Sequence, residues 1–306
     1  MDLITFLLLL SSVLPVKDST PLLLADPTIF TWEGKHYAYG TNGANANLGI
    51  PVYTSTDLVH WTDKGFALKK GEAFGERGFW APQVFRHGKK FYMAYTANES
   101  IAIAVSDHPE GPFRQQLHRR LPGSSRQIDP FVFFEEGKAW LYHVRVDSGN
   151  RIFTGQLNDD LTDFVPGTLQ ECIRAGTGWE NTNGASWPVA EGPTVIKKDG
   201  RYYLFYSCND FRNIDYAVGI AEADSPQGPF RRIPQNPVIS RHNTGANGSG
   251  HGDVLFSEGK WYYVFHIHFD EKKVGPRRTV LMEMKWNDAL PEVLPATFRR
   301  LRAVRE

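Results

Sequence analysis

The chain has 306 residues, and its 34 basic and 34 acidic side chains give a formal net charge of zero. That length predicts one large domain or two ordinary ones, and the balanced charge argues against a nucleic-acid-binding protein. Aromatic residues make up 13% of the chain, which suits β-structure. No C-x-x-C pair occurs, which excludes a zinc or thioredoxin motif. We expect Cys172 and Cys208 to be separate thiols, with a single disulfide between them as the alternative.

The chain begins with an apolar run, MDLITFLLLLSSVL, that is too short to cross a bilayer. The run is typical of the apolar core of a secretory signal, although it lacks basic residues before it and an A-x-A cleavage site after it. We therefore expect residues 1–20 to be a signal peptide or a disordered leader, and the protein to be secreted or periplasmic. No later segment is apolar and long enough to predict a transmembrane helix.

One pattern recurs five times along the rest of the chain. Each copy has a turn-forming first residue, a β-rich run, a polar turn with glycine and a run rich in aromatic residues. The copies are PTIFTWEGKHYAY from Pro27, PQVFRHGKKFYMAY from Pro82, PFVFFEEGKAWLYHV from Pro130, PTVIKKDGRYYLFY from Pro193 and GDVLFSEGKWYYVFH from Gly252. Glycine in the turn supplies the positive φ that tight hairpins need. A further strand and turn follow each hairpin, so each repeat contains three to four strands.

The spacing of the copies predicts the fold. Consecutive copies begin 55, 48, 63 and 59 residues apart. Four-stranded units at this period predict a β-propeller, here with five blades. A β-sandwich is the alternative, but it does not predict five copies of one hairpin in one order. We expect an all-β protein in which residues 21–306 form a single five-bladed β-propeller domain.

The residues just before each copy are expected to meet at one end of the central channel, because the innermost strands line it. These residues are Asp26, Ala81 with Trp80 before it, Asp129, Glu191, which stands one residue further out, and His251. A lone Asp before Pro is a common turn starter. Three carboxylates brought together raise one another's pKa values, however, and such clusters are typical of catalytic sites.

The chemistry that fits such a cluster is glycoside hydrolysis. It uses one protonated acid to assist the leaving group and one ionised carboxylate on the other face of the sugar. A third carboxylate can hold the pKa of the acid high by repulsion. The motifs ADP at Ala25, IDP at Ile128, EGP at Glu191 and GHG at Gly250 also occur in an order and blade phase that resembles glycoside hydrolase family 43 over essentially the whole chain.

The resemblance implies a role for each of the matched residues. Asp26 would be the general base that activates water, Glu191 the general acid, and Asp129 the residue that modulates the pKa of the acid and orients it. Inversion of configuration is implied, with the base and acid carboxyls roughly 6.5–9.5 Å apart. His251 matches the family's axial histidine, so a structural Ca²⁺ or Na⁺, often held through water, is expected near it. A structural histidine is the alternative, and no cofactor for the chemistry is expected.

Further side chains are candidates for the site. Arg277, in GPRRT, resembles the family arginine that contacts the substrate, with its neighbour Arg278 or a solvated turn as alternatives. Trp80 is expected to stack against the sugar, with core packing between blades as the alternative. His266 and His268 alternate along one strand, so only one can face the axis, and both are interpreted as structural. Four other aromatic residues are candidates for the pocket wall without fixed positions: Trp32, Phe79, Trp179 and Trp187.

The resemblance predicts a glycosidase that removes terminal α-L-arabinofuranosyl or β-D-xylosyl units from plant cell-wall polysaccharides or oligosaccharides. Residues 176–190 are expected to wall off one end of the groove, which favours exo action. The alternatives are an endo-arabinanase or a galactan- or galactofuranose-directed member of the family, and a non-catalytic carbohydrate-binding propeller. A fructan-cleaving propeller is disfavoured, because the flanking Asn of its motif is missing around Asp26. We expect a carbohydrate as the partner and a monomer or weak oligomer.

Overall fold

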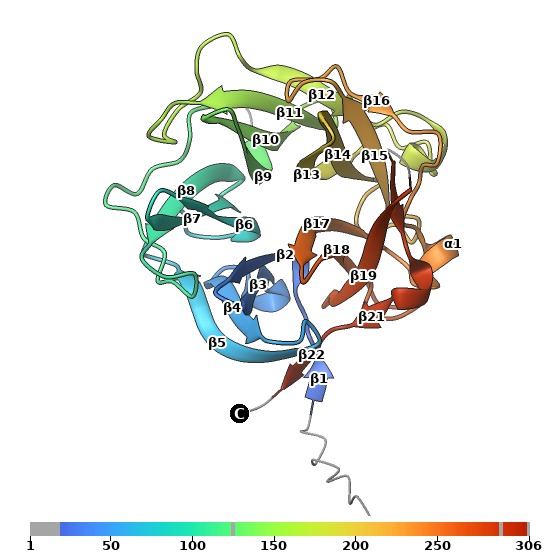
Figure 1. Ribbon diagram of the computed structural model, residues 1–306, viewed down its shortest axis with the longest axis horizontal. Helices are drawn as coiled ribbons and strands as arrows, with labels where there is room; N and C mark the ends of the chain where they lie inside the picture. Colours follow the sequence, from blue (N-terminus) through green and yellow to red (C-terminus); the bar gives the residue numbers. More distant parts are fainter. Residues whose placement is uncertain (1–18, 124–125, 288–289, 305–306) are drawn as a thin grey trace, which may run out of the picture.

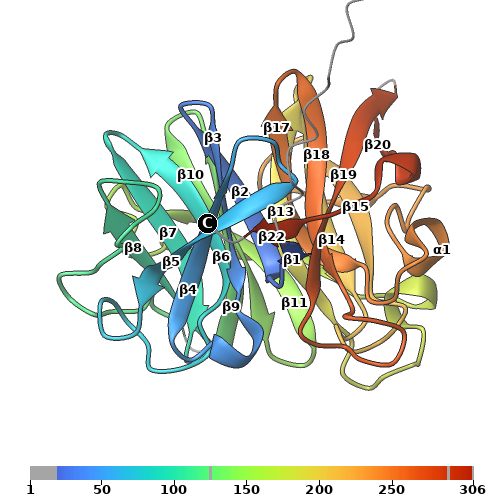
Figure 2. The same ribbon diagram turned by 90° about the horizontal axis from the view of Figure 1, so that it is seen from below.

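The computed structural model of the protein describes residues 19–123, 126–287 and 290–304. Their strands form five sheets arranged as blades around a central axis, which Figure 1 shows end-on and Figure 2 from the side. The predicted all-β five-bladed propeller is therefore confirmed. Among the described residues, no helix combines the length and the apolar character needed to span a membrane. The expectation of a secretory signal falls on residues 1–18, outside the described residues.

Each blade begins with the strand nearest the axis and proceeds outward. The innermost strands are β2 (Ala25–Trp32), β6 (Trp80–His87), β9 (Arg126–Glu135), β13 (Ala190–Lys198) and β17 (Gly250–Ser257). The second strands are β3 (Lys35–Thr41), β7 (Lys90–Ala97), β10 (Lys138–Val146), β14 (Arg201–Cys208) and β18 (Lys260–Ile267). The third strands are β4 (Gly49–Ser55), β8 (Ser100–Ser106), β11 (Asn150–Leu157), β15 (Ala217–Ala223) and β19 (Arg278–Asn287).

The outer edges of the blades differ from one another. Four blades have a fourth strand: β5 (His60–Lys69), β12 (Gln170–Arg174), β16 (Arg231–Arg232) and β20 (Leu290–Val293). The second blade has three named strands, and β21 (Arg299–Arg300) adds to the fifth blade beside β19. Helical structure among the described residues is limited to α1 (Arg241–Thr244) and the 3₁₀ turns η1 (Gly43–Asn45), η2 (Gly178–Asn181) and η3 (Pro295–Thr297).

The turn between the first and second strand of each blade depends on the glycine that the repeats predicted. These glycines have φ between 59° and 82°; they are Gly34, Gly88, Gly137, Gly200 and Gly259. A Cβ added at any of them would meet no other atom within 4 Å. The turn therefore requires glycine for its backbone conformation and not for lack of space.

A separate cluster of buried apolar side chains fills each of the five interfaces between neighbouring blades. Strand β14 shows how alternation feeds two of them. Leu204 and Tyr206 pack toward the third blade, whereas Tyr203 and Phe205 pack toward the fifth. Successive side chains of a strand point to opposite faces, so one short sequence supplies two interfaces. Cys208 lies in the first of these clusters as a free thiol, and so no disulfide joins it to Cys172.

The chain closes the ring by pairing its two ends on the first blade. Strand β22 (Arg302–Val304) runs parallel to β5, and β1 (Ser19–Pro21) pairs with the free edge of β22. Ser19 and Thr20 lie opposite Val304 and Ala303. Ser19 and Thr20, which precede the expected domain start at residue 21, therefore also pair in the sheet, because β22 offers them an edge.

Candidate active site

The innermost strands begin with a shared backbone feature at one end of the axis. The residue at this position has a positive φ in every blade: Asp26 (50°), Ala81 (43°), Asp129 (55°), Gly192 (60°) and His251 (43°). The pairing register between the first and second strand also shifts there, as in a β-bulge. Non-glycine residues in this conformation are strained, and such strain concentrates at functional sites.

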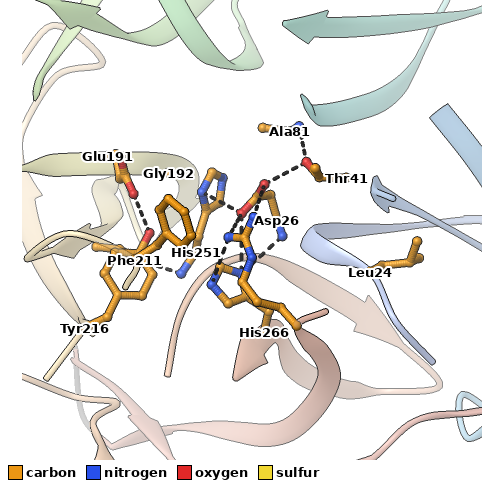
Figure 3. A network of polar contacts seen from close by, with 12 residues as sticks. Leu24, Asp26, Thr41, Ala81, Glu191, Gly192, Phe211, Tyr216, His251 and His266 are labelled. Carbon is orange, nitrogen blue, oxygen red and sulfur yellow. Dashed lines mark hydrogen bonds and ion pairs between the residues drawn. The ribbon is translucent and has the colours of Figure 1, made fainter. Parts of the chain in front are cut away.

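Gly192 explains why Glu191 stands one residue further out than the other acids. In the fourth blade Gly192 takes the position held by Asp26 and Asp129 in their own blades. A Cβ on Gly192 would lie 2.8 Å from the ring of His251, so this position has no room for a side chain. Glu191 therefore approaches the end of the axis from a different backbone position, and Figure 3 shows it apart from Asp26.

Asp26 is held by a cationic partner and by hydrogen bonds. Arg277 Nη1 donates to Asp26 Oδ1 at 2.8 Å, and Thr41 Oγ1 donates to Oδ2 at 2.7 Å. The Nδ1 atoms of His251 and His266 lie 3.3 and 3.4 Å from Oδ1 (Figure 3). Burial alone would raise the pKa of Asp26, but the positive charge of Arg277 leads the effects that hold this pKa well below its usual range.

Glu191 is equally buried, but its hydrogen-bonding partners are neutral. Tyr216 Oη donates to Oε1 and Asn150 Nδ2 donates to Oε2, both at 2.9 Å (Figure 3 draws the first). Burial raises the pKa of Glu191 to about 7, the two hydrogen bonds oppose the rise, and the negative charge of Asp26 adds to it. Glu191 is therefore a group that can carry a proton near neutral pH.

Asp129 contacts the backbone next to Glu191 and lies near His251, which also faces Asp26. Its Oδ2 accepts a hydrogen bond from the backbone N–H of Gly192 at 3.2 Å and lies 3.8 Å from His251 Nδ1. Burial, followed by the negative charges of Glu191 and Asp26, raises the pKa of Asp129 well above its usual range. The bond to Gly192 also fixes the backbone that carries Glu191.

His251 lies on the axis with its Nδ1 toward Asp26 and Asp129. Burial lowers the pKa of His251, which favours the neutral imidazole between the carboxylates of Asp26 and Asp129. Within the described residues, no group of three or more His, Cys, Asp or Glu side chains could hold a metal ion. A single imidazole does not fit the oxygen-rich shell of Ca²⁺ by direct ligation. A cation held through water near His251 stays a prediction, and no step proposed below depends on it.

The structure places the other predicted residues in different ways. Arg277 lies against Asp26, whereas the guanidinium of Arg278 lies 4.4 Å from the centre of the Phe269 ring. Trp80 is half-buried at the start of β6. It stands one residue before Ala81, just as Glu191 stands one residue before Gly192 in the fourth blade. The stacking role of Trp80 stays a prediction.

Several functional partners were missed by sequence reasoning. His266, interpreted as structural, faces the axis and accepts the backbone N–H of Asp26 at 3.1 Å. Thr41 ends β3 and links Asp26 to the backbone of Ala81, whose N–H donates to Thr41 Oγ1 at 3.0 Å. His268 instead contacts the backbone oxygen of Phe211 at 2.8 Å. His266 and His268 do alternate as predicted, and that alternation was the available signal for one of them facing the axis.

The loop between β14 and β15 covers part of the site. Phe211 lies 4.6 Å from the guanidinium of Arg277, and Figure 3 shows Phe211 between Glu191 and Asp26 in that view. Two pockets flank Phe211 and Arg212. One, of about 430 Å³, is lined by residues that include Ala25, Thr41, Phe211 and Arg277, and the other, of about 330 Å³, by residues that include Trp187, Val189 and Asp210, with Arg212 lining both.

Buried carboxylates with opposite shifts in pKa, gathered at one end of a propeller axis, define a class of protein: the glycoside hydrolases, which act on O-glycosyl bonds. The comparison with known families agrees with this class. The profile of glycosyl hydrolases family 43 matches residues 20–291, and this chain belongs to that family. The resemblance found in the sequence motifs is therefore confirmed.

Known proteins similar to this chain differ in activity. A crystal structure of an endo-1,4-beta-xylanase from Bacteroides thetaiotaomicron has a TM-score of 0.89 and 37% identity, over 94% of this chain and 99% of that one. A xylosidase/arabinosidase of Butyrivibrio fibrisolvens is 27% identical over 82% of this chain and 51% of its own length, so this chain spans about half of that relative. A beta-D-galactofuranosidase of Aspergillus niger is 23% identical over 90% of this chain and 82% of its own.

Proposed function

We propose that this protein hydrolyses pentosyl glycosides with inversion of configuration and releases terminal β-D-xylosyl or α-L-arabinofuranosyl units from plant cell-wall polysaccharides or oligosaccharides. The observation that carries the mechanism is the contrast between Asp26 and Glu191. Asp26 is held ionised by Arg277, whereas burial among neutral partners favours a proton on Glu191. An inverting glycosidase needs one carboxyl in each of these states.

In the single displacement step, the proton moves from Glu191 to the substrate while water attacks the opposite face of the sugar. Glu191 donates to the glycosidic oxygen as the bond from that oxygen to the anomeric carbon breaks. Tyr216 and Asn150 hold the carboxyl in place and stabilise the carboxylate that is left. Asp129 contributes by accepting a hydrogen bond from the N–H of Gly192, which fixes the backbone that carries Glu191.

Asp26 acts in the same step on the opposite face of the sugar. It accepts a proton from a water molecule whose oxygen forms the new bond to the anomeric carbon. That water becomes strongly acidic only as its bond to carbon forms, so a carboxylate with a low pKa is a sufficient base. The proton on Asp26 then returns to solvent, and a proton from solvent restores Glu191.

The walls of the site support action at a chain end. The loop 176–190, which joins the third blade to the fourth, lines the pocket of about 330 Å³ together with residues of the segment 210–213. Phe211 and Arg212 of the same segment line the pocket of about 430 Å³. Buried contacts hold the loop, since the Glu180 carboxylate, 2% exposed as a residue, accepts hydrogen bonds from Tyr206 and Arg232. Fixed walls around small pockets suit a terminal sugar better than a long chain. The similar xylosidase/arabinosidase of Butyrivibrio supports a pentosyl substrate.

Endo action on xylan is the second candidate, and the similarity to the Bacteroides endo-xylanase favours it. The same carboxylates would serve both modes of cleavage, because the loops and not the acids decide where a chain can enter. Endo cleavage would require the substrate to pass over Phe211 and Arg212 and to occupy both flanking pockets. The size of the first products therefore distinguishes the two candidates.

One set of assays tests the proposal. The purified protein is incubated with 4-nitrophenyl β-D-xyloside and α-L-arabinofuranoside, and with arabinan, arabinoxylan and xylan. NMR identifies the first anomer formed, and product sizes are measured. We expect the inverted anomer and a free pentose from the polysaccharides. A retained anomer would contradict the roles of Asp26 and Glu191, and early oligosaccharides would replace exo by endo action.

A further inference from the structure

Asn150 joins the proposed acid to an exposed aromatic side chain. Its side-chain amide at the start of β11 bonds in two directions: Nδ2 donates to Glu191 Oε2 at 2.9 Å, and Oδ1 accepts from Trp187 Nε1 at 3.1 Å. The backbone N–H of Asn150 also donates to the oxygen of Pro188 at 2.9 Å. Asn150 therefore fixes the indole of Trp187 relative to the carboxyl of Glu191.

Trp187 is open to solvent, whereas the carboxylate of Glu191, to which Asn150 links it, is buried. It is 44% exposed, and its N–H already has a partner, so the aromatic ring is the part left for a ligand. The ring lines the pocket of about 330 Å³ beside polar side chains, which are Asn181, Asn183, Asn209, Asp210, Arg212 and Asn213. An aromatic face bordered by amide and charged groups is suited to a sugar, which offers C–H groups to the ring and hydroxyls to the rim.

The other aromatic candidates lie elsewhere. Phe79 and Trp32 pack in the interface between the first and second blades, and Trp179 packs against Tyr206. None of these three combines an exposed ring with a hydrogen-bonded link to a carboxylate of the site. Trp187 is thus the candidate with an observation that points toward substrate.

The loop that carries Trp187 is organised before any ligand binds. Glu180 in this loop pairs with Arg232 on the outer strand β16, with 2.6 Å between Oε1 and Nε. Asn209 Oδ1 accepts hydrogen bonds from the N–H and the hydroxyl of Thr182 at 2.9 and 3.0 Å. Because these contacts exist already, binding a sugar on Trp187 would cost little ordering of the loop.

Trp187 lies on the acid side of the site. Its hydrogen-bonding partner Asn150 contacts Glu191. The side-chain partners of Asp26 lie elsewhere, since Thr41 belongs to the first blade and the others belong to the fifth: His251, His266 and Arg277, which directly precedes β19. The acid protonates the glycosidic oxygen, so it stands at the junction between the cleaved sugar and the leaving group. An aromatic surface fixed beside the acid, away from the base, meets the leaving group.

We propose that Trp187 forms the subsite for the leaving sugar and that Asn150 is the residue that positions this surface against Glu191. The inference rests on the proposed function, because it takes Glu191 as the acid. The departing sugar stacks on the indole, and this places the glycosidic oxygen at the carboxyl that protonates it. Asn150 also stabilises the carboxylate that remains after proton transfer.

The test compares substrates that share the cleaved sugar and differ in the leaving group. kcat/KM is measured for Trp187→Ala on xylobiose, whose leaving group is a sugar, and on β-D-xylosyl fluoride, whose leaving group is too small to reach the indole. If wild-type protein prefers arabinose, arabinobiose and α-L-arabinofuranosyl fluoride are used instead. We expect a loss of at least about 10-fold on the disaccharide, from the stacking area removed, and a change within about twofold on the fluoride.

Two variants serve as controls on this comparison. Phe256 is 54% exposed near the end of β17 away from the site, so Phe256→Ala should leave both substrates unchanged. Trp187→Phe keeps an aromatic face but loses the bond to Asn150, so its loss on the disaccharide should be smaller than that of Trp187→Ala. Equal losses of Trp187→Ala on both substrates, or no loss on the disaccharide, would overturn the subsite.

The positioning role of Asn150 has its own readout. Its hydrogen bond favours the ionised form of Glu191, so Asn150→Ala should raise the basic limb of the pH profile of kcat/KM by about 0.5–1 pH unit. A basic limb that stays in place would contradict this role. If the wild type hydrolyses the substrate with inversion and Trp187→Ala keeps the wild-type kcat/KM on the disaccharide, the leaving-sugar subsite is contradicted while the proposed function stands. Absence of hydrolysis by the wild type would defeat the proposed function first.

Discussion

Each of the two sides of the active site buries one carboxylate to the same extent, but the proton affinity is low on one side and high on the other. Asp26 and Glu191 are each 9% exposed. On the side of the first and fifth blades, Arg277 lowers the pKa of Asp26, and on the side of the third and fourth blades, the neutral Tyr216 and Asn150 leave the pKa of Glu191 raised to about 7. The charge of the nearest partner, and not burial, therefore decides which carboxyl is ionised.

A carboxylate away from the site follows the same rule. Asp253, on the innermost strand β17, is hydrogen-bonded by the hydroxyls of Thr28 and Thr194, which come from other innermost strands. Burial raises its pKa to about 6, and the hydroxyls and the N–H of Val254 only partly oppose the rise. Neutral donors thus leave Asp253 with a raised pKa, as they leave Glu191. A cation distinguishes Asp26 from both.

Among the residues that set the proton affinities of the carboxylates, Arg277 is expected to give the largest effect when it is replaced. Arg277→Met should raise the pKa of Asp26, so the base becomes protonated at a higher pH and the acidic limb of kcat/KM moves upward. We expect a loss of at least about 100-fold at pH 5, with a smaller loss at pH 7. The measurement is the pH profile of kcat/KM on a pentosyl fluoride.

The neighbouring arginine provides the matched control for this variant. Arg278 lies over Phe269 and not against Asp26, so Arg278→Met should keep kcat/KM within about threefold of wild type. If Arg277→Met kept the wild-type acidic limb, the partner's charge would not be what ionises Asp26, and the comparison between the two sides would fail.

A smaller effect is expected at Asp253. Its folded-state pKa of about 6 lies above the ordinary value of 3.8. The stability that it contributes is therefore fully present below about pH 4 and is lost as pH rises through 6. Asp253→Asn removes this loss, so the free energy of unfolding at pH 7.5 should rise by up to about 3 kcal/mol relative to wild type, with little difference at pH 4.

Thermal unfolding at the two pH values checks the prediction at Asp253. The gap in Tm between Asp253→Asn and wild type should be a few degrees larger at pH 7.5 than at pH 4. A gap that is the same at both pH values would show that Asp253 is not a protonated group in the fold. Activity serves as the control, because Asp253 contacts none of the three proposed catalytic carboxylates in the described hydrogen bonds and ion pairs.

The sequence predicts the part of the site that each repeat contains. Asp26, Asp129 and His251 occupy one position in a recurring local pattern, and Gly192 at that position marks the displacement of Glu191. This part is readable from sequence because every blade starts its inner strand with the same bulge, so the same short pattern recurs in each repeat. The recurrence of one hairpin five times likewise predicts the ring of blades.

The partners that set the proton affinities could not be predicted in this way. Tyr216 and Asn150 lie 25 and 41 residues from Glu191, and no repeat places them beside it. Thr41 reaches Asp26 from the neighbouring strand, and Trp187 belongs to a loop without a counterpart in the other blades. Such contacts depend on three-dimensional packing. The pairing of Ser19 with Val304 likewise depends on ring closure, which the apolar run at the N-terminus does not reveal.

The dependence on leaving group in Glu191→Ala and Asp26→Ala tests the central claim most directly. A pentosyl fluoride needs little acid assistance, whereas a disaccharide needs it fully. We expect Glu191→Ala to lose at least about 1000-fold in kcat/KM on the disaccharide and no more than about 10-fold on the fluoride, while Asp26→Ala loses at least about 1000-fold on both. Equal losses of Glu191→Ala on the two substrates, or a fluoride activity that survives in Asp26→Ala, would contradict the assignment of acid and base.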